Sequence, residues 1–190
     1  MKARRTAIIL ISALIASMAA VGISLVDPQP AQAADGAYVH RCGGGEIFLN
    51  EQEARTLALH DQVRAEHDLE PLCVHPKLQQ AARAHSQEML DRDYAAHESY
   101  NGETVKQRLK RFGYGFSRYS YYAYGENIAW GAGAQNSPES AFDFWMKSPD
   151  HRPNILSAKF RQIGVGARTG EFQTYGESTM YTVDFGVRRR

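Results

Sequence analysis

The stretch WMKSPDHRPNIL, residues 145–156, is the most informative part of this chain. An aromatic helix end meets a Ser148-Pro149 break, an isolated histidine follows at His151, and the sequence then turns apolar again. A proline restricts the residue before it to extended backbone, so helices usually end at such a position. The stretch therefore predicts a helix that ends directly before a loop, with a histidine in that loop.

Four helices are predicted around this stretch. Apolar residues recur at helical spacing over residues 53–67 and 76–91, and a capping box at Thr104 and a Ser137 cap begin two more. The first helix is expected to pack through Ala54, Leu57, Ala58, Asp61 and Ala65, with His60, Arg64 and His67 on its solvated face. His85, on the apolar face of the second helix, is interpreted as a core histidine.

Strand patterns fill the remaining sequence. Residues 127–130 form a short apolar run, residues 162–168 place glycines opposite apolar side chains, and residues 179–187 alternate between the two faces. Helices through most of the chain and a sheet concentrated at its end indicate an α+β fold, in which helices cover a small sheet.

The first 33 residues resemble an export signal. A basic start, an apolar stretch over residues 7–26 and the small-residue pattern at 31–33 are typical of a cleaved leader. A membrane anchor is the alternative, because about 20 apolar residues could span a bilayer. We therefore expect a signal peptide at 1–33, an N-terminal extension at 34–52 and one globular domain at 53–190, secreted and without a transmembrane segment in the mature chain.

The two cysteines, Cys42 and Cys73, both lie in the exported part of the chain. An oxidising compartment favours their pairing, and the loop-entropy model assigns about 3 to 4 kcal/mol to such a disulfide. A metal site on these cysteines is the weaker alternative, since there is no CxxC motif. The formal net charge of +1 gives no electrostatic reason to expect nucleic acid as a partner.

Several motifs, taken in order, resemble the CAP superfamily of cysteine-rich secretory proteins, antigen 5 and pathogenesis-related proteins, in its bacterial branch. These are Ala96-His97-Glu98-Ser99, Gly125-Glu126-Asn127-Ile128-Ala129, the 148–156 segment, Ile163-Gly164-Val165-Gly166 and Asp184-Phe185-Gly186. The resemblance covers nearly all of the mature domain and implies an α-β-α sandwich with a small mixed or antiparallel sheet.

The resemblance also implies one open cleft in which His97 and His151 hold a divalent metal together with Glu126. The family's second glutamate is missing, because Ser148 occupies its position, as is usual in the bacterial branch. We therefore expect a divalent metal, zinc before others, to bind weakly. Glu126 is equally well interpreted as a polar group that satisfies buried donors of the fold.

Other apparent signals fail or stay open. His97-Glu98 begins like HExxH, but Asn101 stands where the second zinc ligand belongs. Ser99 has no oxyanion-hole motif around it, so a nucleophile and base pair with His97 is disfavoured. Four tyrosines precede Gly125 and are candidate ligand-binding residues at the cleft entrance, with coverage of the sheet end as the alternative: Tyr119, Tyr121, Tyr122 and Tyr124.

The sequence therefore predicts a secreted monomeric binding or effector module whose partner is a cell-envelope component, a lipid or another protein. The alternative is a metal-dependent extracellular hydrolase that acts on peptide or envelope material, with Glu126 as the catalytic base.

Overall fold

The computed structural model describes residues 36–190, so the predicted signal peptide lies outside the described residues. Its elements follow in the order β1 (Ala37–His40), β2 (Glu46–Leu49), α1 (Glu51–Glu66), β3 (Cys73–Val74), α2 (Pro76–Asp91), α3 (Val105–Arg111), β4 (Tyr121–Ala132), η1 (Gly133–Gln135), α4 (Pro138–Lys147), α5 (Arg152–Ile155), β5 (Gln162–Glu171) and β6 (Glu177–Arg189). Within this range no helix is both long and apolar enough to cross a membrane.

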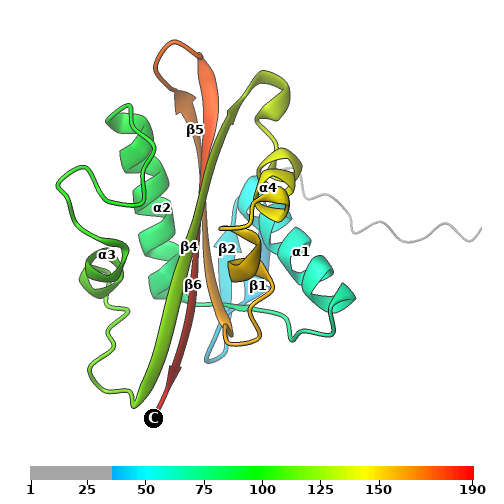
Figure 1. The fold of residues 1–190 in the computed structure, drawn as a ribbon, viewed down its shortest axis with the longest axis vertical. Coiled ribbons are helices and arrows are strands. Elements are labelled where there is room, and N and C mark those ends of the chain that lie inside the picture. Colours follow the sequence, from blue (N-terminus) through cyan, green and yellow to red (C-terminus); the bar gives the residue numbers. More distant parts are fainter. Residues whose placement is uncertain (1–35) are drawn as a thin grey trace, which may run out of the picture. The chain divides into compact units, whose positions relative to one another are not determined.

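The central sheet is mixed, with strand order β3-β5-β6-β4. β6 pairs antiparallel with β4 and with β5, whereas the short β3 runs parallel to β5. Helices α2 and α3 lie on one side of the sheet and α1 and α4 on the other, as Figure 1 shows. The α-β-α sandwich predicted from the resemblance is therefore confirmed.

Two glycines of β5 let α2 lie directly on the sheet. A Cβ built on Gly164 would come within 2.2 Å of the backbone carbon of Leu78, and one on Gly166 within 2.3 Å of the Ala82 carbonyl oxygen. The glycines predicted to lie opposite the apolar residues of this strand are thus required by the close helix contact.

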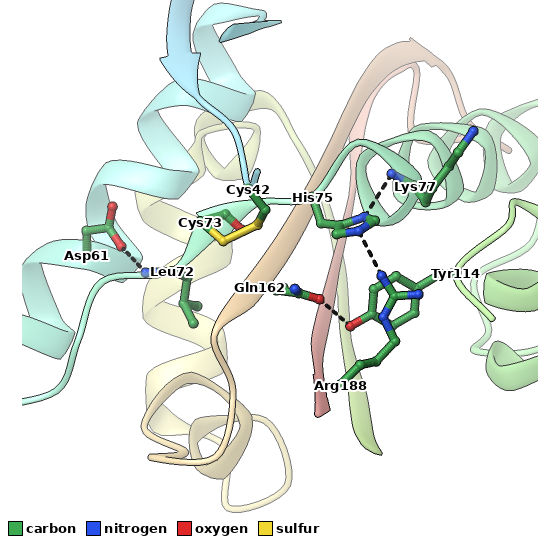
Figure 2. Close-up of a disulfide and its surroundings, with 9 residues drawn as sticks. All are labelled: Cys42, Asp61, Leu72, Cys73, His75, Lys77, Tyr114, Gln162 and Arg188. Carbon is green, nitrogen blue, oxygen red and sulfur yellow. Dashed lines mark hydrogen bonds between the residues drawn. A yellow bond between two sulfur atoms is a disulfide. The ribbon is translucent and has the colours of Figure 1, made fainter. Parts of the chain in front are cut away.

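The disulfide between Cys42 and Cys73 is present, as predicted. It joins the loop of the β1-β2 hairpin to β3 (Figure 2). Arg41 and Val74, the sequence neighbours of the two cysteines, form a β-bridge. The hairpin itself was not predicted from the sequence, which indicated only an extension tied to the domain.

The buried face of α1 differs from the predicted one. Its buried residues are Glu53, Thr56, Leu57, His60, Val63 and Arg64, whereas Ala58 and Ala65 are exposed. The hydrophobic pattern predicted the wrong face because two polar residues on the buried face, Glu53 and Arg64, bond to partners far along the chain. Arg64, for example, donates to the carbonyl oxygens of Glu70, Ile155 and Ser157 at 2.9, 2.8 and 3.1 Å.

His60 is also buried, in contrast to the expectation that it is solvated. Its ring packs against Phe142, Trp145 and Phe185, and its Nδ1 lies 2.7 Å from the carbonyl oxygen of Thr56. Burial lowers the pKa of His60 to about 4, so the ring stays neutral in the core. His85, in contrast, is buried as predicted and bonds the Ala96 carbonyl.

Candidate functional site

A cavity of about 670 Å³ lies beside the edge strand β4. Its walls come from the end of α2 and the segment after it, from β4, and from α4. Much of the lining is apolar or aromatic, and the two histidines of the predicted site, His97 and His151, both belong to it. The aromatic part consists of Trp130, Phe144 and Tyr175, which are 38, 54 and 56% exposed.

His97 follows α2 and is held by Glu126. The His97 Nδ1–H donates to Glu126 Oε1 at 2.8 Å, which leaves Nε2 as the ring atom with no partner among residues 36–190. This hydrogen bond raises the pKa of His97 above its usual 6.5, against the opposing effect of burial. A carboxylate behind an imidazole fixes the ring orientation and makes its far nitrogen more basic.

Glu126 lies on β4 with its side chain only 2% exposed. Arg108 of α3 donates to Glu126 Oε2, and the same guanidinium donates to the His97 carbonyl at 3.0 Å and to Ser99 Oγ at 3.2 Å. Burial by itself would raise the pKa of Glu126, but the His97 hydrogen bond and the Arg108 charge outweigh it and lower the pKa. Glu126 is therefore a carboxylate whose two oxygens are both engaged.

Arg108 was not recognised from the sequence as part of this site, although a signal existed. It stands three residues after Val105 and directly before the buried Leu109 on α3, and it is 1% exposed. A cation within an apolar stripe needs a buried partner, because an unpaired buried charge is very costly. That argument would have indicated a carboxylate nearby.

Asp184 of β6 is a second residue that sequence reasoning missed. It stands directly opposite Glu126 in the β4-β6 register and is fully buried. Neither of its oxygens has a hydrogen-bond donor among the described residues. Burial, and then the charge of Glu126, raise the pKa of Asp184 well above its usual value. A protonated Asp184 can donate a hydrogen bond to the Glu126 carboxylate beside it, which provides a hydrogen-bond partner for a buried Asp184 oxygen.

His151 precedes α5 and is oriented by Ser148. Its Nδ1 lies 2.7 Å from Ser148 Oγ, so its Nε2, like that of His97, has no partner in the described part of the chain. Asn127 donates to the His151 carbonyl at 3.1 Å and thereby ties this loop to β4. Burial, and then the charge of His97, lower the pKa of His151. The residue in the position of the family's second glutamate is thus the one that orients the second histidine.

Of the three predicted metal ligands, only the two imidazoles of His97 and His151 are available to bind a metal. Between residues 36 and 190 no group of three or more His, Cys, Asp or Glu side chains is placed to hold an ion. Glu126, predicted as the third ligand, has its oxygens bound to His97 and Arg108. It fits the role of the carboxylate that orients His97 better than that of a direct ligand.

The four candidate tyrosines do not line this cavity. Tyr121, Tyr122 and Tyr124 belong to the first part of β4, whereas the cavity contacts residues 128–132 at the other end of the strand. The structure does not bring them to the lining of this cavity. Any ligand that they bind would lie on a separate surface.

The model of the cysteine-rich secretory protein family, CAP, matches residues 57–185. Among curated proteins, the uncharacterized protein YkwD of Bacillus subtilis strain 168 is 39% identical over 114 residues, which cover 60% of this chain and 41% of YkwD. The uncharacterized membrane protein YlbC of the same strain is 29% identical over 114 residues, which cover 60% of this chain and 31% of YlbC. This chain thus spans less than half the length of either relative.

Solved structures give the same fold. An extracellular protein containing an SCP domain, from Bacillus anthracis strain Ames, matches with a TM-score of 0.56 and 25% identity over 77% of this chain and 47% of that one. An outer surface protein from Borrelia burgdorferi matches with a TM-score of 0.57 and 16% identity over 81% of this chain and 99% of that one. The second likeness is one of fold alone.

Proposed function

This chain belongs to the cysteine-rich secretory protein (CAP) family, and we propose that it works outside the cytoplasm as a binding module whose cavity takes up an apolar ligand. The supporting observation is the lining of the cavity, in which three partly exposed aromatic rings stand beside two histidines held through Nδ1. Ligand pockets are typically about 300 to 1,000 Å³ and mostly apolar, with a few polar groups that fix orientation.

The two imidazoles give the cavity its polar end. Each ring is held by a partner at Nδ1 and has Nε2 left for a ligand atom or for a divalent metal. Bound zinc would supply a positive charge able to attract an anionic ligand group. With only two imidazole ligands the metal is held weakly. Its affinity decreases as the pH is lowered, because an imidazole must be neutral to ligate.

A metal-dependent hydrolase is the second candidate, and the two free Nε2 atoms are the observation that favours it. In that reaction Glu126 would be the base that takes a proton from the attacking water. The ion pair with Arg108 and the lowered pKa of Glu126 make it a weak base near neutral pH. Binding without turnover is therefore the better supported function.

The test combines two probes and matched variants. We expect a fluorescent fatty acid to bind the purified protein and Phe144→Ala to weaken that binding about tenfold, as expected for about 1.4 kcal/mol of lost aromatic contact. Phe48→Ala is the matched control, since Phe48 is 42% exposed on β2 and does not line the cavity. Equal affinities in both variants would contradict an apolar ligand in this cavity.

Titration calorimetry with zinc chloride tests the polar end. His97→Ala and His151→Ala should each abolish zinc binding while thermal melts stay cooperative, because the core does not depend on these partly exposed rings. Cleavage of peptide or cell-wall material in the presence of zinc or calcium, lost in Glu126→Gln, would overturn the binding-only function.

A further inference from the structure

A second surface lies at the start of β4, away from the cavity. Tyr121, Tyr122 and Tyr124 are 40, 38 and 37% exposed there. The register places Tyr121 opposite Arg189 and Tyr122 opposite Arg188, at the C-terminal end of β6. We call the group formed by Lys106, Tyr119, Tyr121, Tyr122, Arg188 and Arg189 the basic tyrosine surface.

Cations on this surface lie over aromatic rings. The Arg188 guanidinium carbon is 3.8 Å from the ring centroid of Tyr114 and 4.7 Å from that of Tyr119. Figure 2 shows Arg188 beside both Tyr114 and His75, and the His75 Nε2 is 2.9 Å from the guanidinium. Such contacts hold a guanidinium in place without neutralising it. Arg188 is therefore a fixed positive charge at this end of the sheet.

Two further cations extend the pattern. Arg189 lies over Tyr121 at 5.6 Å, and Lys106 Nζ lies 4.9 Å from the Tyr122 ring centroid while donating to its hydroxyl at 2.8 Å. Tyr121 and Tyr122 point to opposite sides of the strand, because successive side chains of a strand alternate. The surface consequently follows the edge of the sheet and has aromatic and basic groups on both sides.

In the described part of the chain, no carboxylate forms an ion pair with these cations. The ion pairs among residues 36–190 engage arginines, histidines and a lysine elsewhere in the fold, and none includes Lys106, Arg188 or Arg189. His75 beside them adds no charge of its own, because burial and then the charges of Arg188, Lys77 and Arg41 lower its pKa to about 4 and keep the ring neutral. Since the whole chain has a net charge of only +1, these cations are a local concentration of charge.

We propose that the basic tyrosine surface binds an acidic polysaccharide. Tyrosine offers an apolar ring face for a sugar ring and a hydroxyl for its hydroxyl groups, and the guanidinium and ammonium groups complement the acidic substituents. Nucleic acid would also combine rings with negative charge. The near-neutral chain and the small number of cations favour a polymer whose acidic groups are more widely spaced.

The experiment measures retention of the purified protein on polygalacturonate, on neutral dextran and on oligothymidylate, each at low and high salt. We expect binding to polygalacturonate that weakens as salt is added, and none to dextran. The double variant Lys106→Gln/Arg189→Gln should bind about tenfold more weakly, at roughly threefold for each exposed charge. The matched control is Lys147→Gln/Arg55→Gln, which removes the same two residue types from pairs with Asp143 and Glu139 and should bind like the wild type.

Equal losses in the two double variants would overturn the proposal, because a general charge effect would then explain the binding. Retention on dextran equal to that on polygalacturonate would also overturn it, and so would tighter binding to oligothymidylate, which would assign the surface to nucleic acid. His151→Ala should bind polygalacturonate like the wild type. This variant separates the basic tyrosine surface from the cavity, so that either proposal can fail alone.

Discussion

Glu53 and Glu126 are both buried carboxylates held by cations, yet they lie in regions of different character. Glu53 joins three elements, because Arg83 of α2 and Arg168 of β5 donate to it at 2.9 Å while it caps α1 by accepting from the Asn50 backbone. Glu126 is held by Arg108 and by His97. The first glutamate has two arginines as partners, and the second has one arginine and one group that can lose its proton.

That single difference separates a structural clamp from a candidate site. Arginine is not a proton donor or acceptor in ordinary protein chemistry, so the two arginines of the Glu53 cluster serve to hold elements together. His97 can release a proton, and it lines the cavity. A buried carboxylate becomes part of a site when one of its partners titrates and also faces a ligand space.

The largest expected effect comes from Glu126→Gln, which leaves Arg108 buried without its carboxylate. We expect the free energy of unfolding, measured by urea denaturation, to fall by about 3 kcal/mol, the low end for breaking a buried pair. The low end applies because Asp184 can give up its proton and partly replace the lost charge. The double variant Arg108→Met/Glu126→Gln should recover most of the loss, and a double variant as unstable as the single one would contradict this.

The next effect tests whether loss of the Glu53 carboxylate lowers the free energy of unfolding less than loss of the Glu126 carboxylate. Glu53→Gln should cost about 2 kcal/mol, because the Arg83 and Arg168 side chains are 29 and 28% exposed and can regain water. Urea denaturation alongside Glu126→Gln gives the ranking. A cost larger than that of Glu126→Gln would show that clamping three elements matters more than the burial of the partner cation.

The smallest effect is a pair of pKa shifts at the cavity. His97 has a raised pKa, so its contribution to stability is complete below about pH 6.5 and is lost as the pH rises through the raised pKa. Histidine NMR titration should show the His97 pKa above 6.5 in the wild type and lower in Glu126→Gln. In His97→Ala the pKa of His151 should rise, because the neighbouring charge is gone. An unchanged His151 pKa would show that the two rings do not share a cavity.

Local sequence determined much of the fold. Caps at Thr104 and Ser137 begin α3 and α4, as predicted, because side-chain oxygens near a helix start satisfy free backbone amides. The pair Cys42 and Cys73 was predictable because the sequence contains only these two cysteines. The candidate residues His97, Glu126 and His151 were named through ordered motifs, and no hydrophobic pattern would have selected them.

The tertiary structure decided which polar groups are buried and what they contact. Local patterns rank side chains by hydrophobicity, so they placed His60 and Arg64 in solvent and gave Arg108, Ser148 and Asp184 no part in the site. The reason is physical, since burial of a polar group depends on its partner. Arg108 meets Glu126 across 18 residues of sequence, and Arg64 reaches the Ile155 carbonyl across 91. Only the folded sandwich brings such partners together.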